Sequence, residues 1–564
     1  MKKIWLKSYP KGVPAEVDMS QYDSLVDLLE ESFKNYANDN AYILMDKGLT
    51  YGEMDAGSKA FAAYLQGLGL KQGDRVAIMM PNVLQYPIAL AGILRAGMIA
   101  VNVNPLYTAR ELEHQLNDSG SKAIIILENF ASVLQEVIGK TSVKHTMVAS
   151  VGEMLGLVKG TITNFVIRKV KKAVPAYSLP GSIAFTKAVA AGKGMSFNKP
   201  TIKSTDVAVL QYTGGTTGLS KGATLLHSTI IAALLASEAW VQPALERNPI
   251  VGQPTFICAL PLYHVFAFIS CSLLSMRVGG VNILIPNPRD METSVKTMSK
   301  YKFHFLPAVN TLFNGFLNTP AFMELDFSQL RVSNGGGMAV QASVAKEWFD
   351  VTGCPICEGY GLSETSSGIT CNPTDMDEFT GTIGLPMPGV DIKILDDNGK
   401  EVKIGERGEI AISGPQVMAG YWENDAETAE VMTKDNFFKS GDVGIMDKKG
   451  YLKIVDRIKD MILVSGFNVY PNEIEGVAAG HPGVLEAAVI GVPDKKAGEA
   501  VMIFVIKKDP NLTEADLRDY CTDKLTGYKK PKYIEFRDDL PRTNVGKILR
   551  RELRDEVLKT WDKG

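Results

Sequence analysis

The chain has 564 residues, which is too many for one hydrophobic core, so we expect several lobes. Its 60 basic and 63 acidic residues leave a net charge of −3, and with no overall positive field we expect no nucleic-acid partner. The six cysteines are too few for a disulfide framework in a chain of this size, which favours a reducing compartment.

The sequence offers no clear export or membrane-spanning segment. The start, MKKIWLKSYPKG, reaches Lys7 and Pro10 before any apolar run forms, so it does not read as a signal peptide. The best candidate span, residues 256–276, is interrupted by Pro261, Tyr263 and His264, which favours a buried strand, a loop and a core helix. We therefore expect a cytoplasmic protein.

The N-terminal part alternates helical and strand patterns. In order, the pattern predicts a helix from the capping box at 50–53 to about residue 68, a strand at 75–80, a helix near 87–96, a strand at 99–103, a second capping box at 108–111 and a strand at 122–127. A second run of this kind spans roughly 206–371. Such alternation indicates largely parallel sheets covered by helices.

Residues 157–177 form a basic segment without an acidic residue. Its apolar positions include Ile162, Phe165 and Val170, and its basic residues are Lys159, Arg168, Lys169, Lys171 and Lys172. This pattern is typical of an amphipathic helix that adheres reversibly to the inner face of a membrane. A helix packed on the protein body with a solvated basic face explains the pattern equally well.

The pattern changes again towards the C-terminus. Short alternating runs bounded by glycines from about 384 to 454 indicate a small β unit, and the charged link 456–460 leads into a compact αβ tail. We place the main domain boundary at this link. Cys354 and Cys357 spell C-x-x-C, but no second pair completes a zinc site, which favours a buried strand.

The stretch YTGGTTGLSKGA, residues 212–223, has the composition of a loop that holds phosphate oxygens. Its glycines allow close backbone approach, and its short hydroxyl side chains supply donors. It is not a Walker A loop, because Lys221 follows Ser220 and precedes Gly222.

Three further motifs accompany this loop in the sequence: YGLSE at 360–364, SGD at 440–442 and TNVGK at 543–547. Together with LPLYHVF at 260, NGGGMAV at 334, EGYGLSE at 358 and DMILVSGFNVYPNEIE at 460, they occur in the order found in acyl-adenylate-forming enzymes of the AMP-binding superfamily. Nearly the whole chain resembles the bacterial long-chain fatty-acid–CoA ligases of that superfamily. It departs from them at Asp435–Ser440, where the family usually has Asn-Gly-Trp-Leu-His-Thr, and at Ser363, where it commonly has threonine.

The resemblance implies an α/β fold with a large N-terminal domain, 1–456, made of two helix-covered sheets and a small β-barrel at about 384–456. A hinge at 457–459 and a small, mobile α+β C-terminal domain at 460–564 follow. It implies an ATP-dependent ligase that makes an acyl-adenylate and pyrophosphate, then acyl-CoA and AMP, and so feeds β-oxidation. Mg²⁺ would be the metal, ATP and CoA the co-substrates, and a homodimer stays open.

The resemblance also assigns roles to residues. Nucleotide and CoA would be bound by Tyr212, Thr213, Gly214, Gly215, Thr216, Thr217, Gly218, Leu219, Ser220, Lys221, Gly222, Ala223, Gly335, Gly336, Gly337, Glu358, Gly359, Tyr360, Gly361, Ser363, Asp442, Arg457 and Gly466. Lys547, Glu364 and Lys459 would be catalytic, with Lys459 as the hinge. Thr213 and Glu364 would hold the metal, and His264, Gly337 and Gly361 would lie at the acyl substrate.

Two other functions were weighed. A medium-chain or aryl-acid ligase on the same fold is the nearest alternative, and the basic amphipathic segment favours the long-chain enzyme. A silent fatty-acid-binding or scaffold protein would be marked by loss of Lys547, Glu364 or Asp442, and all three are present. The acyl chain-length range cannot be read from any periodicity in the sequence.

Overall fold

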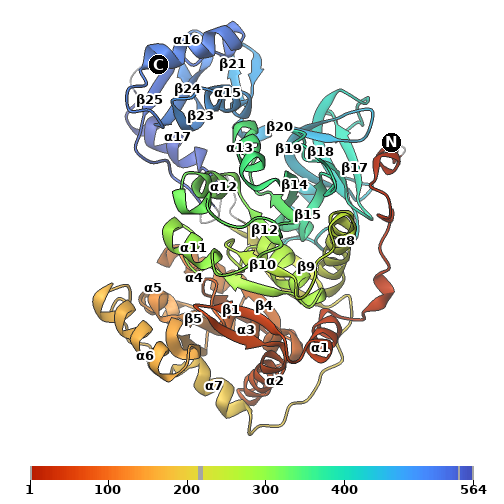
Figure 1. The fold of residues 1–564 in the computed structure, drawn as a ribbon, viewed down its shortest axis with the longest axis vertical. Helices are drawn as coiled ribbons and strands as arrows, with labels where there is room; N and C mark the ends of the chain where they lie inside the picture. The colour runs from red at the N-terminus through yellow and green to blue at the C-terminus, as the bar shows by residue number, and fades with distance from the viewer. Residues whose placement is uncertain (1–2, 214–219, 544–545, 562–564) are drawn as a thin grey trace.

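The structure is a computed structural model that describes residues 3–213, 220–543 and 546–561 (Figure 1). Two large sheets and a smaller one form the N-terminal part, and a fourth sheet lies in a separate body at the C-terminal end. This agrees with the α/β fold class predicted from the sequence.

The first large sheet has seven strands in the order β7-β6-β5-β3-β4-β8-β9. Its strands are β3 (Arg75–Met79), β4 (Ile99–Asn102), β5 (Ala123–Leu127), β6 (His145–Ala149), β7 (Ile183–Ala184), β8 (Val207–Thr213) and β9 (Lys221–Leu226). All neighbours pair in parallel except β8 and β9, which are antiparallel and are joined by the glycine-rich loop. The predicted strands and their parallel arrangement are confirmed here.

The second large sheet has nine strands in the order β16-β15-β14-β13-β12-β10-β11-β1-β2. Its strands are β1 (Asn40–Leu44), β2 (Lys47–Thr50), β10 (Thr255–Cys258), β11 (Val281–Leu284), β12 (Phe305–Ala308), β13 (Val332–Gly335), β14 (Ile356–Leu362), β15 (Ser367–Cys371) and β16 (Leu385–Pro386). It is parallel from β14 to β1. Cys357 lies in β14 and Cys354 lies just before it, and both are buried, as predicted.

Helices cover these sheets and connect their strands. They are α1 (Leu25–Asn35), α2 (Tyr51–Gly67), α3 (Gln85–Arg95), α4 (Ala109–Asp118), α5 (Ala131–Val137), α6 (Leu157–Phe165), α7 (Phe185–Gly192), α8 (His227–Arg247), α9 (Val265–Ala267), α10 (Leu274–Arg277), α11 (Met291–Met298), α12 (Asn310–Leu317) and α13 (Ala342–Thr352). Both predicted capping boxes are present, because Thr50 and Thr108 each exchange hydrogen bonds with the glutamate three residues later. Helix α8 has the length and apolar composition to cross a membrane, yet 67% of that window is buried inside the protein.

The segment 256–276 folds as predicted. It begins in β10, passes through a turn and continues as α9, a π-helical stretch (Phe268–Leu273) and α10, and most of its side chains are buried. Its apolar character therefore serves the core between the two large sheets.

The small β unit is an antiparallel sheet in the order β17-β18-β19-β20. Its strands are β17 (Asp391–Leu395), β18 (Arg407–Ser413), β19 (Phe438–Met446) and β20 (Leu452–Arg457), and α14 (Asp425–Val431) lies between β18 and β19. In the part of the chain that the structure describes, β17 and β20 are the two edges, so these strands form an open sheet where we expected a barrel. Four strands are too few to close on themselves around a packed interior.

The C-terminal sheet contains β21 (Ile462–Val464), β22 (Phe467–Val469), β23 (Val484–Asp494), β24 (Gly498–Lys507) and β25 (Tyr533–Phe536). Three helices pack on it, α15 (Pro471–Ala479), α16 (Glu514–Lys524) and α17 (Arg550–Lys559). Its two faces have their own buried clusters, around Ile503 and around Phe504, separate from the core of the large sheets. Figure 1 shows this domain standing apart at the top of the molecule.

One buried side chain ties the carboxyl ends of the two large sheets together. Asn82, which follows β3, is 2% exposed. Its amide nitrogen donates to the carbonyl oxygens of Cys258 (3.0 Å) and Leu260 (2.9 Å), and its oxygen accepts from the amide of Leu262 (2.8 Å). The loop that carries His264 is therefore held by Asn82, and Gln211 of β8 adds a hydrogen bond to the Tyr263 carbonyl (3.1 Å).

We predict that Asn82→Ala lowers the free energy of unfolding by about 2–4 kcal/mol, because it leaves several buried backbone groups without partners. The first urea-induced unfolding transition measures this change. Asn398→Ala, in an exposed turn, is the matched control and should change it by less than about 0.5 kcal/mol. Equal stability of the two variants would contradict the role assigned to Asn82.

Candidate active site

A cavity of about 2870 Å³ lies where the two large sheets, the small β unit and the C-terminal domain meet. It is larger than the roughly 300–1,000 Å³ of most ligand sites. Residues from all four sheets line it, for example Thr213, Tyr360, Asp442 and Ile490, and Lys547 lines it as well. A cavity of this size has room for more than one substrate.

Glycines at the ends of β13 and β14 bring the backbone close to the cavity. Gly335, Gly336, Gly337, Gly359 and Gly361 all line it. A Cβ atom on Gly361 would lie 1.8 Å from the carbonyl oxygen of Ser367, so no other residue fits between these paired strands. Gly337 has a φ of +78°, which favours glycine at this turn.

Glu358 lies between these glycines. It is 5% exposed, and its Oε1 accepts a hydrogen bond from the amide of Val340 at 3.0 Å. Burial raises the pKa of this carboxyl to about 8, which favours the neutral acid at neutral pH.

Tyr360, Asp442 and Arg457 form a buried cluster on one wall of the cavity. Asp442, on β19, is 3% exposed, and its two oxygens contact the Tyr360 hydroxyl (2.6 Å) and the Arg457 Nε (3.1 Å). Because β19 and β20 pair Asp442 with Arg457, the sheet register itself places the two charges together. The sequence predicted all three residues.

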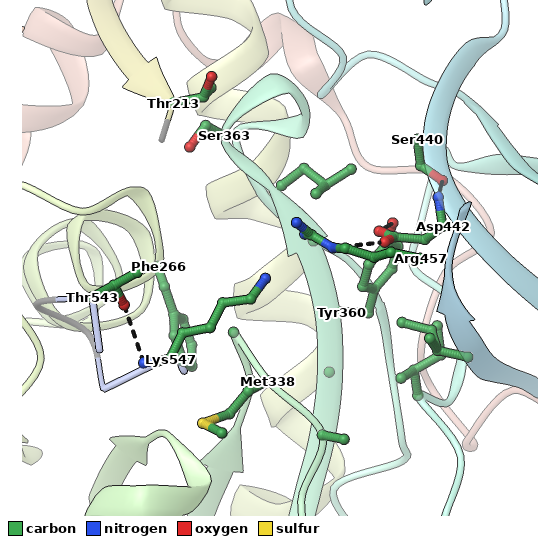
Figure 2. A pocket seen from close by; sticks show the side chains of 18 of the residues that line it. Thr213, Phe266, Met338, Tyr360, Ser363, Ser440, Asp442, Arg457, Thr543 and Lys547 are labelled. Atoms are coloured by element: carbon green, nitrogen blue, oxygen red, sulfur yellow. Dashed lines mark hydrogen bonds and ion pairs between the residues drawn. The ribbon is translucent and has the colours of Figure 1, made fainter. Parts of the chain in front are cut away.

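Lys547 reaches this cluster from the C-terminal domain. Figure 2 shows its side chain crossing the cavity towards Tyr360, Asp442 and Arg457. Burial, followed by the positive charge of Arg457, lowers the pKa of Lys547 to about 7. The negative charge of Asp442 opposes this effect. A lysine with such a pKa can change its charge when an anion enters.

The loop that carries Lys547 is fixed against the N-terminal domain. The amide of Thr543 donates to the Lys547 carbonyl (2.7 Å), and the Lys547 amide donates to the Thr543 hydroxyl (3.1 Å). Gly546, with a φ of +81°, packs against Thr311, and a Cβ atom there would lie 2.4 Å from the Thr311 hydroxyl. Any larger residue at 546 would push the loop away from α12.

The two ends of the glycine-rich loop lie at the edge of the cavity. Thr213 ends β8 and Lys221 begins β9, while Gly214, Gly215, Thr216, Thr217, Gly218 and Leu219 lie outside the described residues. Lys221 forms an ion pair with Glu427. Burial and then the positive charge of Lys459 lower the pKa of Lys221, so the two predicted cations lie near each other.

The described residues on either side of this loop contact neighbouring elements. The Tyr212 hydroxyl donates to Asp118 (2.5 Å), and His114 hydrogen-bonds the carbonyl of Ser220 (2.8 Å). Gly222 packs against the Tyr212 ring, and Ala223 is buried opposite Tyr421. His114 and Asp118 lie on α4, about a hundred residues earlier, and no local motif in the sequence marks them.

Glu364 and Ser363 lie in a short 3-10 turn after β14, and both line the cavity together with Thr213. The Tyr421 hydroxyl donates to Glu364 Oε1 at 2.9 Å. Burial raises the pKa of Glu364 from its usual value, so a nearby cation would favour its charged form. A carboxylate and a hydroxyl beside a phosphate loop are suitable ligands for magnesium.

His264 lies at the start of α9, where its Nδ1 accepts a hydrogen bond from the amide of Phe266 (3.3 Å). Burial, and then the charge of Lys547, lowers the pKa of His264 to about 4. The ring is therefore neutral at physiological pH and only weakly basic.

Among the described members of the predicted set, Ala223 and Gly466 do not line the cavity. Ala223 is buried next to the loop, whereas Gly466 lies in another part of the molecule. This glycine lies in the turn between β21 and β22, where Phe467 is 55% exposed and stacks on Tyr528 at 4.7 Å. In this arrangement of the domains, that hairpin stands away from the residues around Lys547.

Sequence reasoning missed a second cluster, around Arg550. This guanidinium contacts Glu475 (2.6 Å), Asp460 (3.0 Å) and Asp456 (3.5 Å). Asp456 also accepts from the amide of Asn472 at 2.8 Å, and burial raises its pKa to about 6. These residues join the end of β20 to the C-terminal domain. An arginine three positions after Lys547 gives no local signal of that role.

Comparison with known proteins places this site in a family. The sequence model of the AMP-binding enzyme family matches residues 29–422. The family model of the AMP-binding enzyme C-terminal domain matches residues 473–547. A long-chain-fatty-acid–CoA ligase of Escherichia coli O6:H1 is 53% identical over 558 residues, covering 99% of each chain.

Solved structures agree with these matches. The anthranilate CoA ligase AuaEII in complex with anthranoyl-AMP superposes with a TM-score of 0.83 at 25% identity, covering 96% of this chain and 99% of that one. ATP-bound MatB from Rhodopseudomonas palustris gives 0.80 at 28% identity, covering 95% and 100%. The chain therefore belongs to the AMP-binding enzyme family, in both its AMP-binding domain and its AMP-binding C-terminal domain.

Proposed function

We propose that this protein is an ATP-dependent long-chain fatty-acid–CoA ligase that feeds fatty-acid β-oxidation. A fatty carboxylate attacks the α-phosphorus of ATP, giving acyl-adenylate and pyrophosphate, and the CoA thiol then displaces AMP to give acyl-CoA. Identity of 53% over nearly the whole chain supports this substrate class. The observation that carries the reaction type is the buried ammonium of Lys547 beside Asp442 and Arg457.

Lys547 serves the first half-reaction. Two anions, the carboxylate and the α-phosphate, must meet, and the transition state carries extra negative charge. A preorganised ammonium in a site shielded from water stabilises that charge far more than water does. Its lowered pKa fits this role, because an entering polyphosphate favours the protonated form.

The cluster on the opposite wall binds the nucleoside. Tyr360 stacks on adenine, and Asp442 accepts hydrogen bonds from the ribose hydroxyls with Arg457 beside it. Each oxygen of Asp442 has one partner already, and a carboxylate oxygen accepts two. The bond from Tyr360 thus positions Asp442 without blocking it.

The phosphates lie at the glycine-rich loop. Burial and then the positive charge of Lys459 lower the pKa of Lys221 there, and a polyphosphate would favour the charged form of Lys221. Thr213 and Glu364 would hold Mg²⁺, which when bound would neutralise phosphate charge and so favour departure of pyrophosphate.

The acyl chain follows the apolar part of the cavity. That part is lined by Val241 on α8, Leu274 on α10 and Val332 at the start of β13. Val332 lies three residues before Gly335, or about 10 Å along the strand. Neutral His264 and Gly337 border the entrance to this part. Each methylene buried there contributes about 0.8 kcal/mol, which favours long chains over short ones.

The second half-reaction requires a different arrangement of the domains. We place the N-terminal domain at 1–456, the hinge at 457–459 and the C-terminal domain at 460–564. The short helical turn Ile458–Asp460, which contains Lys459, supports this division because it links two sheets with separate cores. Rotation there withdraws Lys547 and brings the turn at Gly466 towards the acyl-adenylate for CoA to bind.

Three further properties belong to the proposal. The enzyme works in the cytoplasm, contacts the inner face of the membrane reversibly through 157–177, and is compatible with a homodimer.

The direct test is pyrophosphate release from ATP with a series of fatty acids and aryl acids, with and without CoA. We expect release to rise with chain length and CoA to increase turnover. Higher release with aryl or medium-chain acids would contradict the substrate class, and no release with any acid would contradict the reaction.

We predict that Lys547→Ala reduces acyl-adenylate formation by about 10²- to 10³-fold, because the transition state loses its preorganised cation. Conversion of preformed acyl-adenylate and CoA to acyl-CoA should be retained, and single-turnover assays separate the two steps. The control is Lys508→Ala, which removes an exposed lysine of the same domain. Equal loss of both half-reactions would refute the role of Lys547.

The pKa of Lys547 predicts a pH dependence. Since the cation is the active form and its pKa in the free enzyme is about 7, kcat/KM for ATP in adenylation should fall as pH rises through 7. Lys547→Arg should be slower but should lack this fall, because a guanidinium stays protonated. A wild-type profile flat from about pH 6 to about pH 9 would contradict the assignment.

A further inference from the structure

Helix α6 has the reverse of the usual arrangement of a surface helix, because its polar side faces the protein and its apolar side faces outward. Its inner side is small and polar: Gly160 packs on Gly152, where a Cβ atom would lie 2.1 Å from the Gly152 carbonyl oxygen. Asn164 accepts from the amide of Gly152 (2.8 Å) and donates to the Ser150 hydroxyl (3.0 Å). Polar and backbone contacts therefore attach this helix to the protein body.

The outward side is apolar. The exposed fractions are 91% for Leu157, 76% for Val158, 58% for Ile162, 58% for Phe165 and, in the following π-helical turn (Val166–Val170), 66% for Val170. Val158, Ile162 and Phe165 follow one another at helical spacing, so they form a continuous stripe opposite Gly160 and Asn164. A contiguous apolar patch of this kind marks a surface that a membrane or another molecule covers.

Positive charge surrounds this stripe. Lys159 and Arg168 form ion pairs with Asp46 and Glu128. Asp290 is near enough to Lys171 for the two charges to interact. Within the part of the chain that the structure describes, Lys169, Lys171 and Lys172 form no ion pair within 4 Å, and all three are exposed. With no acidic residue from 157 to 177, the segment combines an apolar stripe with net positive charge.

We propose that α6 and the turn after it dock on an anionic lipid bilayer, with the helix lying in the interface and the lysines contacting lipid phosphates. An apolar stripe flanked by lysine and arginine is complementary to such a surface. In Figure 1 the helix lies near the end of the molecule opposite the C-terminal domain, so docking leaves that domain free. The surface is inferred from α6 alone, while its use in collecting fatty acids dissolved in the bilayer rests on the proposed function.

The test is co-sedimentation of the full chain with vesicles of phosphatidylglycerol and phosphatidylethanolamine, and with phosphatidylcholine vesicles. Wild type should bind the anionic vesicles and lose much of that binding in high salt. Ile162→Ser/Phe165→Ser should weaken binding at least about tenfold. Val251→Ser, at an exposed valine far from the segment, is the matched control and should bind as wild type does.

A second pair of variants tests the charge. Lys169→Ser/Lys172→Ser should weaken binding to anionic vesicles by about tenfold or more, while Lys434→Ser/Lys448→Ser, which removes the same charge elsewhere, should not. None of these side chains lies at the cavity, so pyrophosphate release with albumin-delivered fatty acid should match wild type in all variants.

These measurements separate the two proposals. Absence of wild-type binding to anionic vesicles, or equal binding by the Ile162/Phe165 variant, would overturn the docking surface, and a protein would then be the better candidate to cover α6. Vesicle binding without pyrophosphate release would leave the surface intact and overturn the proposed function. If both hold, the Ile162/Phe165 variant should be slower than wild type only with fatty acid supplied in vesicles.

Discussion

The chemistry proposed for this protein depends on a single lysine ammonium, carried by one domain and partly shielded from water beside a charged pair held by another. Desolvating Lys547 is unfavourable, and Arg457 makes it more so, while Asp442 compensates only in part. The positive charges of Lys547 and Arg457 together exceed the negative charge of Asp442 beside them. In the proposed reaction an entering nucleotide would offset this excess, which would couple binding of the anion to protonation of Lys547.

Two kinds of contact keep that ammonium in place. One is a steric fit, in which Gly546 lets the loop lie directly on Thr311 of α12. The other is electrostatic: Arg550 forms ion pairs with Asp456, Asp460 and Glu475. Asp456 lies just before the hinge residues 457–459, and the other two lie after them. A rotation at 457–459 would separate Asp456 from Arg550. Because breaking a buried pair is costly, the arrangement seen here is stable until other contacts replace this one.

The exposed side of helix α6 presents the reverse situation. At the cavity, polar groups are buried and are stabilised by partners, whereas on α6 apolar groups are exposed and lack them. In our two proposals, a ligand in the cavity and a lipid surface at α6 would each supply favourable contacts. Their separation along the long axis in Figure 1 lets the two surfaces act at the same time.

Local patterns predicted much of this molecule. The capping boxes at Thr50 and Thr108 and the strands of the first sheet follow from hydrogen bonds and side-chain alternation within a few residues, which the sequence displays directly. The order of motifs identified the residues that line the cavity, including Asp442 and Lys547, because each motif is a short stretch with its own backbone requirements. The four strands expected to close into a barrel instead leave two edges, since closure depends on strand pairing over long distances.

The sequence by itself therefore determined the elements, the loops between them and the chemical groups available for catalysis. Only the tertiary structure decided which of these groups meet: Arg550 with Asp456, His114 with Ser220 of the glycine-rich loop, and Gly466 away from the cavity. It also decided which face of α6 is buried, because Gly160 and Asn164 face the protein and Phe165 faces outward, while the membrane contact of 157–177 stays a prediction. The reason is physical: an amphipathic pattern defines two faces of a helix, but the packing partner selects which of them is buried.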